Sequence, residues 1–337
     1  GNPINIALDI AIDVTNVVDV ESTAFYSQLT YAISDKLNLT AGVRTTDEEK
    51  TVFGNQYKPA SKTYILKGVT NVARWKETTS MFAVDYQVTE DLMAYVSFSE
   101  GFKSGGFNPR PVGGFTAAPF GPEYVESTEI GFKSELFDRR LRLNGAFYSS
   151  DYKDLQFSVN RFNEATGTLE LLVGNAAEAE IDGYELEIEA VVSENLSLRA
   201  SFGNTDFEIT NLYPGTSPEI TLNTQQANSP ENTSALSLIY SAPMLNGMTT
   251  FRLDYSNQDE SFADIQNTQE LLQEANDMIN ARLAYESSSN WEVALFGTNL
   301  SDERVIEGGT SNIASFGHAE ATYTRPREYG VSLRLNF

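Results

Sequence analysis

The sequence has no cysteine and only one histidine, His318. Without cysteine the chain cannot form a disulfide scaffold or a thiolate metal site. A single histidine disfavours a histidine metal centre and a Ser–His catalytic pair, so we expect His318 to be an ordinary loop residue. No run of 18 apolar residues occurs, which excludes a membrane-spanning helix. We therefore expect no enzyme activity, no cofactor and no metal centre.

Positive charge is also scarce. The 337 residues include 23 lysines and arginines against 47 aspartates and glutamates, a formal net charge of -24 at pH 7. Nucleic-acid binding needs a basic surface that neutralises phosphates, so we expect no nucleic-acid partner. The sequence begins without methionine or a signal peptide, and GNPINIALD reads as a chain already under way. We expect a fragment or a processed piece.

Short stretches of alternating apolar and polar residues recur along the chain. In YGVSLRLNF, residues 329–337, the odd positions are apolar except for the amphipathic tyrosine, and the even positions are small or polar. The same period of two appears at 37–43, 183–192 and 196–202. This period is typical of β-strands with two different faces. We count about thirteen strands, and a fourteenth could lie at 4–14.

The predicted strands form pairs joined by short polar turns. These turns lie at 34–36, 89–91, 137–139, 193–195, 243–247 and 287–290. Successive pairs are separated by longer stretches rich in Gly, Asn, Pro and Asp, which we expect to be loops at 47–74, 103–123, 161–176, 211–228, 258–274 and 303–324. The pattern predicts an antiparallel, up-and-down meander with short turns at one end and long loops at the other.

Either a soluble β-sandwich or a transmembrane β-barrel could bury the apolar face of these strands. Strands of about ten residues have the length needed to cross a bilayer at a tilt, which favours the barrel. Aromatic residues also gather on the apolar face near the short turns, as in an interfacial girdle: Tyr31, Tyr86, Tyr240, Tyr285 and Trp291. Cross-strand aromatic pairing in a soluble sheet is the alternative explanation, and it does not account for clustering at one end.

The opposite face carries many charges, which also favours a polar barrel lumen. The residues expected to point into the lumen are Arg44, Lys133, Glu135, Arg142, Glu185, Glu187, Glu189, Arg199, Arg252, Arg282 and Arg334. The three glutamates lie about 7 Å apart along one strand. Paired carboxylates can hydrolyse glycosides, but the better explanation is pairing with arginines on adjacent strands, such as Arg199.

Five segments, in order, resemble TonB-dependent outer-membrane receptors. YVSFSEGFKSGGFNPR (95–110) resembles a strand that enters an outer loop, and the long segment 123–156 resembles the hairpin after it. NAAEAEIDGYELE (175–187) resembles the next strand of that family. NWEVALFGTNLSDERV (290–305) and RPREYGVSLRLNF (325–337) resemble its last two strands. The resemblance extends from about Ser22 to the end of the chain.

The resemblance implies a particular architecture. Members of the family carry a TonB box, a plug domain and a 22-stranded barrel with short periplasmic turns and long extracellular loops. Nothing in this sequence resembles the plug. We therefore interpret residues 1–337 as the C-terminal portion of such a barrel, with a lead-in strand or loop at 1–21 and hairpins at 22–337. The alternative is a free-standing 14-stranded diffusion channel or adhesin.

The resemblance also implies a function and a location. Such a receptor would lie in the Gram-negative outer membrane, among lipid and lipopolysaccharide. It would take up a scarce nutrient such as a ferric siderophore, energised by the TonB complex through the plug. The terminal Phe337 resembles the aromatic residue that the barrel-assembly machinery recognises.

The long loops are the natural binding surface for a ligand. Aromatic walls with a few polar groups suit a siderophore, sugar or cobalamin-like compound. The candidate ligand contacts are Phe102, Lys103, Phe107, Asn108, Arg110, Phe115, Phe120 and Tyr124. Packing within the loop and an outer aromatic girdle are the competing explanation for each aromatic residue. Acidic and amide residues in other loops, such as Asp206 and Asp259, could hold Ca²⁺ or bridge to lipopolysaccharide, although they match no EF-hand spacing.

Overall fold

The structure is a computed structural model that describes residues 11–108, 118–163, 168–313 and 317–335. One antiparallel sheet of thirteen strands dominates this part of the chain. In order across the sheet, its strands are β1 (Asp13–Ser34), β2 (Leu37–Lys58), β3 (Thr63–Thr89), β4 (Leu92–Lys103), β7 (Glu123–Leu136), β8 (Leu141–Asn163), β9 (Thr168–Ser193), β10 (Leu196–Leu212), β11 (Asn232–Met244), β12 (Gly247–Gln258), β15 (Asn276–Ser287), β16 (Trp291–Thr298) and β19 (Glu328–Leu335). The predicted all-β, up-and-down architecture is confirmed.

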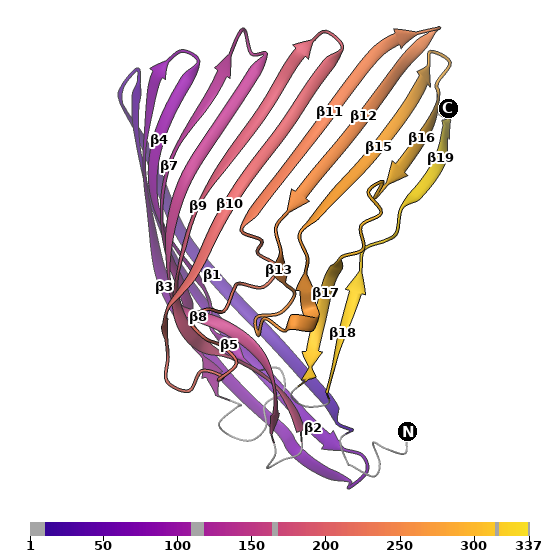
Figure 1. The fold of residues 1–337 in the computed structure, drawn as a ribbon. Coiled ribbons are helices and arrows are strands. Elements are labelled where there is room, and N and C mark those ends of the chain that lie inside the picture. Colours follow the sequence, from indigo (N-terminus) through magenta and orange to yellow (C-terminus); the bar gives the residue numbers. More distant parts are fainter. Residues whose placement is uncertain (1–10, 109–117, 164–167, 314–316, 336–337) are drawn as a thin grey trace.

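Small elements occupy the long connections. They are the two-stranded pairs β5 (Gly106–Phe107) with β6 (Pro119–Phe120), β13 (Ser261–Phe262) with β14 (Leu272–Gln273), and β17 (Ile306–Asn312) with β18 (His318–Tyr323), and a 3₁₀ turn, η1 (Gln269–Leu271). The short turns meet at one end of the sheet, and these elements lie toward the other end (Figure 1). All six predicted turns are present between the strands that they were expected to join.

Two of the predicted loops consist mostly of extensions of strands of the main sheet. β2 and β3 continue through most of 47–74, and residues 59–62 alone connect them. β8 and β9 extend likewise into 161–176. The prediction failed here because backbone hydrogen bonds continue where side chains no longer alternate between apolar and polar. A strand that projects into water on both faces needs no such alternation.

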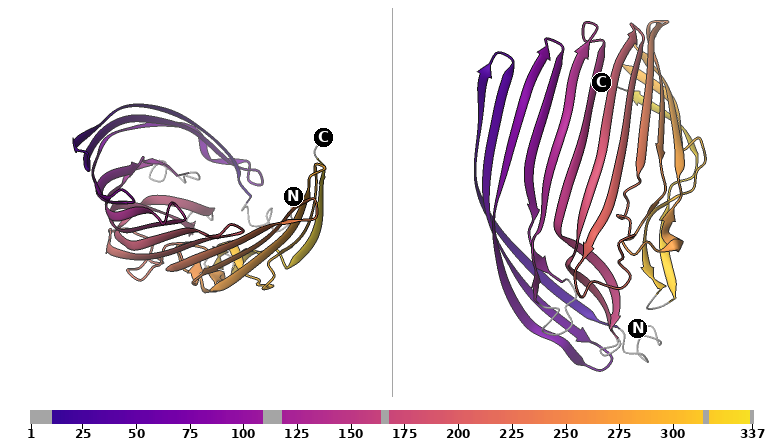
Figure 2. Two further views of the ribbon diagram at one scale, coloured as in Figure 1. Left: turned by 90° about the horizontal axis from the view of Figure 1, so that it is seen from above. Right: turned by 60° about the vertical axis from the view of Figure 1, so that its left-hand side comes forward.

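The sheet is curved and open (Figure 2). Within the described ranges, β1 pairs only with β2 and β19 only with β16, so the two edge strands are not joined to each other. A closed 14-stranded barrel would need a link between these edges. β1 also runs without interruption across the expected boundary between lead-in and hairpins at residues 21 and 22; most of the suggested strand at 4–14 lies outside the described residues.

One face of the sheet carries an exposed band of large apolar side chains. On β1 and β3 the band includes Phe25, Tyr31 and Tyr86, and on the last strands it includes Leu295 and Val331. The register places Tyr240, Phe251, Leu283, Leu295 and Val331 opposite one another across five consecutive strands. Near the turns, the rings of Tyr285 and Trp291 lie 5.4 Å apart. A continuous apolar face of this kind is stable only against an apolar environment.

Candidate functional site

The opposite, concave face is polar. On β9 the side chains of Glu185, Glu187 and Glu189 alternate with the apolar band, and the register places Arg142 and Arg199 on either side of Glu189. Arg142, Glu187, Glu189, Arg199 and Arg252 line a hollow of about 630 Å³ on this face. The alternation in the sequence thus separates an apolar surface from a charged one.

Ion pairs join neighbouring strands across the concave face. Arg142 Nη2 lies 3.0 Å from Glu135 Oε1, and its Nη1 lies 3.2 Å from Glu189 Oε2. Arg199 Nε lies 3.7 Å from Glu189 Oε1. Asn144 Nδ2 donates to Glu187 Oε2 over 3.3 Å. Glu189 and Glu187 therefore each have a partner on an adjacent strand, and these contacts link neighbouring strands of the sheet.

The other predicted lumen charges occupy different parts of the sheet. Arg252 Nε lies 2.8 Å from Asp254 Oδ2, and Arg282 Nη2 lies 2.6 Å from Glu292 Oε1. Arg44 Nε donates to Thr46 Oγ1 over 3.1 Å, and Arg334 lies opposite Glu292 in the register. The charged side chains in these ion pairs are exposed to solvent or only partly buried. Each ion pair therefore contributes at most about 1 kcal/mol to stability.

The structure separates the predicted ligand contacts into two groups. Phe102 lies opposite Tyr124 between β4 and β7, and Lys103 Nζ lies 4.0 Å from Glu123 Oε2. The Tyr124 hydroxyl donates a hydrogen bond to Glu77 Oε1 over 2.9 Å. Burial is the largest cause that raises the pKa of Tyr124 to about 12, and the Glu77 carboxylate is the next. The side chains of Lys103 and Tyr124 are thus paired with carboxylates at the loop end of β4 and β7. Arg110 and Phe115 lie outside the described residues.

The second group surrounds an apolar pocket. Phe107 pairs with Pro119 in the short β5–β6 ladder, and both Asn108 and Phe120 line a cavity of about 340 Å³. The remaining wall includes Phe157, Leu172, Val173, Pro214 and Ile220, none of which was predicted from the sequence as a ligand contact. The signal for them was weak: an apolar Leu-Leu-Val run at 171–173 and one isoleucine in a polar loop.

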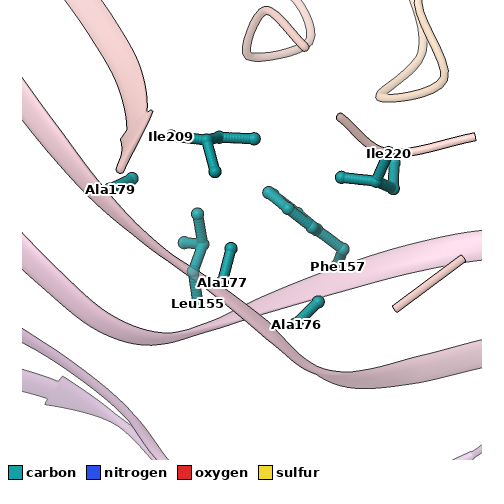
Figure 3. Close-up of a cluster of buried hydrophobic side chains, with 7 residues drawn as sticks. All are labelled: Leu155, Phe157, Ala176, Ala177, Ala179, Ile209 and Ile220. Carbon is teal, nitrogen blue, oxygen red and sulfur yellow. The ribbon is translucent and has the colours of Figure 1, made fainter. Parts of the chain in front are cut away.

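A small hydrophobic core supports this pocket from the side of the sheet. Ala177 and Ala179 of β9 pack with Ile209 of β10, and the Phe157 ring lies between Ile209 and Ile220 (Figure 3). Ala179 lies on the same face of β9 as the three glutamates, because an even number of positions along the strand separates it from each of them. Ile220 belongs to the loop between β10 and β11, so that loop folds onto the concave face.

Side-chain amides fix the walls of the pocket. Asn175 Nδ2 donates to the carbonyls of Asp154, Gly121 and Pro122 at 2.7, 3.1 and 3.0 Å, and its Oδ1 accepts from Gly121 N at 2.7 Å. Asn108 Oδ1 accepts a hydrogen bond from the Val173 amide. These contacts tie the β4–β7 connection to β8 and β9, so the pocket is preformed rather than assembled around a ligand.

A second contact ties the β4–β7 connection to the other side of the concave face. Lys50 Nζ lies 2.7 Å from Ser104 Oγ, 2.8 Å from the Gly105 carbonyl and 3.1 Å from Glu48 Oε1. It also lies 5.6 Å from the centre of a Trp75 ring. Ser104 donates to Glu48 as well. The Lys50 clamp, defined by these contacts, holds residues 104 and 105 against β2.

No group of three or more potential metal-binding side chains of His, Cys, Asp or Glu occurs in the described part of the chain. Asp264, an acidic residue between β13 and η1, accepts hydrogen bonds from the backbone and hydroxyl of Thr268 at 2.9 and 2.6 Å. None of the helical turns within the described ranges is long and apolar enough to cross a membrane.

Comparison with known proteins identifies the family of the chain that carries these features. Residues 1–300 match the family model described as TonB dependent receptor-like, beta-barrel. The chain belongs to the TonB-dependent receptor family. This family is a class of receptors and transporters rather than a class of enzymes.

Relatives within the family share part of the sequence and most of the fold. The Pesticin receptor of Yersinia enterocolitica is 26% identical over 179 residues, which cover 51% of this chain and 24% of that protein. The ferric yersiniabactin uptake receptor from Yersinia pestis aligns with a TM-score of 0.82 at 20% identity, over 97% of this chain and 47% of that one. A siderophore receptor from Acinetobacter baumannii aligns with a TM-score of 0.73 at 21% identity, over 94% and 43%. The chain thus spans about half the length of these solved receptors.

Proposed function

We propose that this chain is part of the barrel wall of an outer-membrane receptor that takes up a scarce nutrient such as a ferric siderophore. The observation that supports this most directly is the open, two-faced sheet, which aligns over 97% of its length with a ferric yersiniabactin uptake receptor. The chain covers 47% of that receptor. We infer that residues 1–337 are the C-terminal portion of a larger barrel, and that β1 and β19 pair with strands outside this chain.

In this proposal the exposed apolar band faces outer-membrane lipid, and the short turns face the periplasm. The loop end, with the candidate ligand contacts, faces outward next to lipopolysaccharide. Phe337, outside the described residues, would serve as the signal for the barrel-assembly machinery. The band of aromatic and aliphatic side chains supports the membrane assignment, because rings such as Tyr285 and Trp291 near the turns suit the headgroup level.

The polar concave face would enclose the plug domain of the complete receptor. TonB would act on that plug to release ligand, and the plug would be encoded elsewhere in the full protein. The hollow of about 630 Å³ and its charged walls support this part of the proposal, because they offer hydrogen-bonding and ionic partners to a polar domain. Glu189, Arg142 and Arg199 are the central residues of that surface.

The experiment is an uptake assay on the complete gene. A strain without other siderophore receptors would express the full-length protein, and cells would be given ⁵⁵Fe with a panel of purified siderophores. We expect at least one chelate to be accumulated, and accumulation to stop when TonB is deleted. Matched cells carrying the empty vector provide the background.

Equal iron accumulation with and without the receptor, for every chelate, would refute the proposed function. Accumulation that continues at the same rate without TonB would instead indicate a passive channel. Expression of the receptor under iron limitation would give independent support.

A further inference from the structure

The apolar pocket between the β5–β6 ladder and the β10–β11 loop contains no charged side chain among the described residues of its wall. Its wall combines Phe120, Phe157, Leu172, Val173, Pro214 and Ile220 with amides, a serine, a threonine and glycines. This is unusual in a chain in which 21% of residues are charged. The lining therefore favours a ligand surface that needs no ionic partner.

Polar groups of Asn108, Asn175 and Thr216 in the wall already have partners within the protein. Asn108 Oδ1 accepts from the Val173 amide, and Thr216 Oγ1 donates to the Ala176 carbonyl over 2.8 Å. The side-chain amide of Asn175 is bonded to backbone groups at both its oxygen and its nitrogen. A charged ligand group placed here would lose water without gaining an ionic contact, which is costly.

Two glycines leave part of the pocket open. A Cβ atom added at Gly174 or at Gly215 would meet no atom within 4 Å. Gly174 lies opposite Phe157 in the β8–β9 register, so a side chain at this position would project on the same face as that ring. The cavity of about 340 Å³ is within the range of small-ligand pockets, about 300–1,000 Å³.

We propose that this pocket receives an uncharged aromatic or aliphatic portion of an iron chelate, and that the receptor selects chelates without net negative charge. The inference rests on the proposed uptake function and adds the chemical class of its ligand. The formal net charge of -24 on this chain acts in the same direction, because a net negative charge repels polyanions.

The test measures binding of ⁵⁵Fe chelates to the purified full-length receptor by equilibrium dialysis. The probes are the neutral 3:1 ferric complexes of maltol and of ethyl maltol, and the triply negative ferric complex of a hexadentate tris-catecholate. We expect the neutral complexes to bind and the anionic one to bind at least tenfold more weakly. We also expect the ethyl maltol complex to bind more tightly than the maltol complex, by about fourfold for each added methylene that is buried.

The variant Gly174→Leu fills the open part of the pocket, and we expect it to weaken binding of the neutral complexes at least tenfold. Gly308→Leu is the matched control, because Gly308 lies on β17 and its nearest atom to an added Cβ is Thr322 Oγ1, 3.8 Å away. We expect this variant to bind as the parent does. Heat-modifiability on gels confirms that both variants form barrels.

Tighter binding of the tris-catecholate, absence of binding by both neutral complexes, or unchanged binding by Gly174→Leu would each overturn the inference. The cellular uptake assay separates this failure from that of the proposed function. TonB-dependent iron uptake from anionic chelates alone would leave the uptake function in place and refute the selection for uncharged ligands. No TonB-dependent uptake from any chelate would refute the function itself.

Discussion

Tyr95 of β4 lies directly over Gly131 of β7. A Cβ atom at Gly131 would lie 2.6 Å from Tyr95 Oη and 2.7 Å from the Gly145 carbonyl oxygen. The tyrosine hydroxyl donates to Glu129 Oε1 over 2.6 Å, and Lys133 Nζ lies 5.7 Å from the ring centre. The ring can cover the strand only because the glycine has no side chain.

Gly131→Ala should therefore destabilise the barrel. The added methyl group must displace either the Tyr95 ring or the backbone of β8, at a cost of about 1–3 kcal/mol. Urea unfolding of the full-length receptor in detergent, followed by heat-modifiability, would measure this change. Gly174→Ala is the control, because its Cβ meets open space; equal midpoints for the two variants would contradict the explanation.

Lys50→Met should loosen the segment 103–108. The variant removes two hydrogen bonds to residues 104 and 105 and leaves the mostly buried Glu48 carboxylate without its cation. The expected local loss is about 1–3 kcal/mol, measured as faster hydrogen exchange of that segment. Lys67→Met is the control, because Lys67 is exposed, lies over the Tyr64 ring on β3 and is not part of the Lys50 clamp. Equal hydrogen exchange of residues 103–108 in the two variants would show that the Lys50 clamp is not needed to hold this segment.

The Lys50 clamp should also weaken in acid. Glu48 lies outside the apolar band. The hydrogen bond from Ser104 is the main cause that holds the pKa of Glu48 below its ordinary value of 4.5, and Lys50 lowers this pKa further. Because the folded-state pKa is depressed, its stabilising contribution is present above pH 4.5 and is lost as the pH falls through the lowered value. Exchange of residues 103–108, corrected for its intrinsic pH dependence, should rise below that point. In Glu48→Gln this additional rise should disappear.

Glu189→Arg should disturb the seating of a plug more than the barrel itself. The variant replaces the acid shared by Arg142 and Arg199 with a third cation on the concave face. Exposed ion pairs contribute at most about 1 kcal/mol each, so the barrel should still form. We expect cells to become more sensitive to vancomycin, a large antibiotic excluded by an intact outer membrane. Glu194→Arg, in a short turn, makes the same charge change and should not alter sensitivity.

Phe337→Ala should lower insertion of the full-length receptor more than the stability of inserted molecules. The reason is that a terminal aromatic residue would act during recognition by the assembly machinery rather than in the finished wall. Quantitative immunoblots of outer-membrane fractions would measure insertion, and urea midpoints would measure stability. Equal membrane levels of variant and parent would contradict this role.

Local patterns in the sequence were sufficient for the strands and their short turns. The turn at 137–139 was predicted from its polar residues, and the structure shows positive φ angles at Phe137, Asp138 and Arg139. The alternation also predicted the Arg199 contact with a glutamate, although the partner is Glu189 alone of the three glutamates. These features depend on residues that are close in sequence or opposite each other in a hairpin, where the period of two determines the face.

The apolar pocket could not be derived in this way. Phe120 comes from the β4–β7 connection, Phe157 from β8 and Ile220 from the β10–β11 loop, and they meet only because that loop folds onto the concave face. The positions of Gly131 opposite Tyr95 and of Gly174 opposite Phe157 likewise depend on the register between strands. Alternation along the chain was enough to predict a two-faced antiparallel wall, since it fixes which side chains share a face. The loops that meet over that wall became evident in the folded molecule alone, because contacts between distant segments depend on chain direction and packing that no local pattern records.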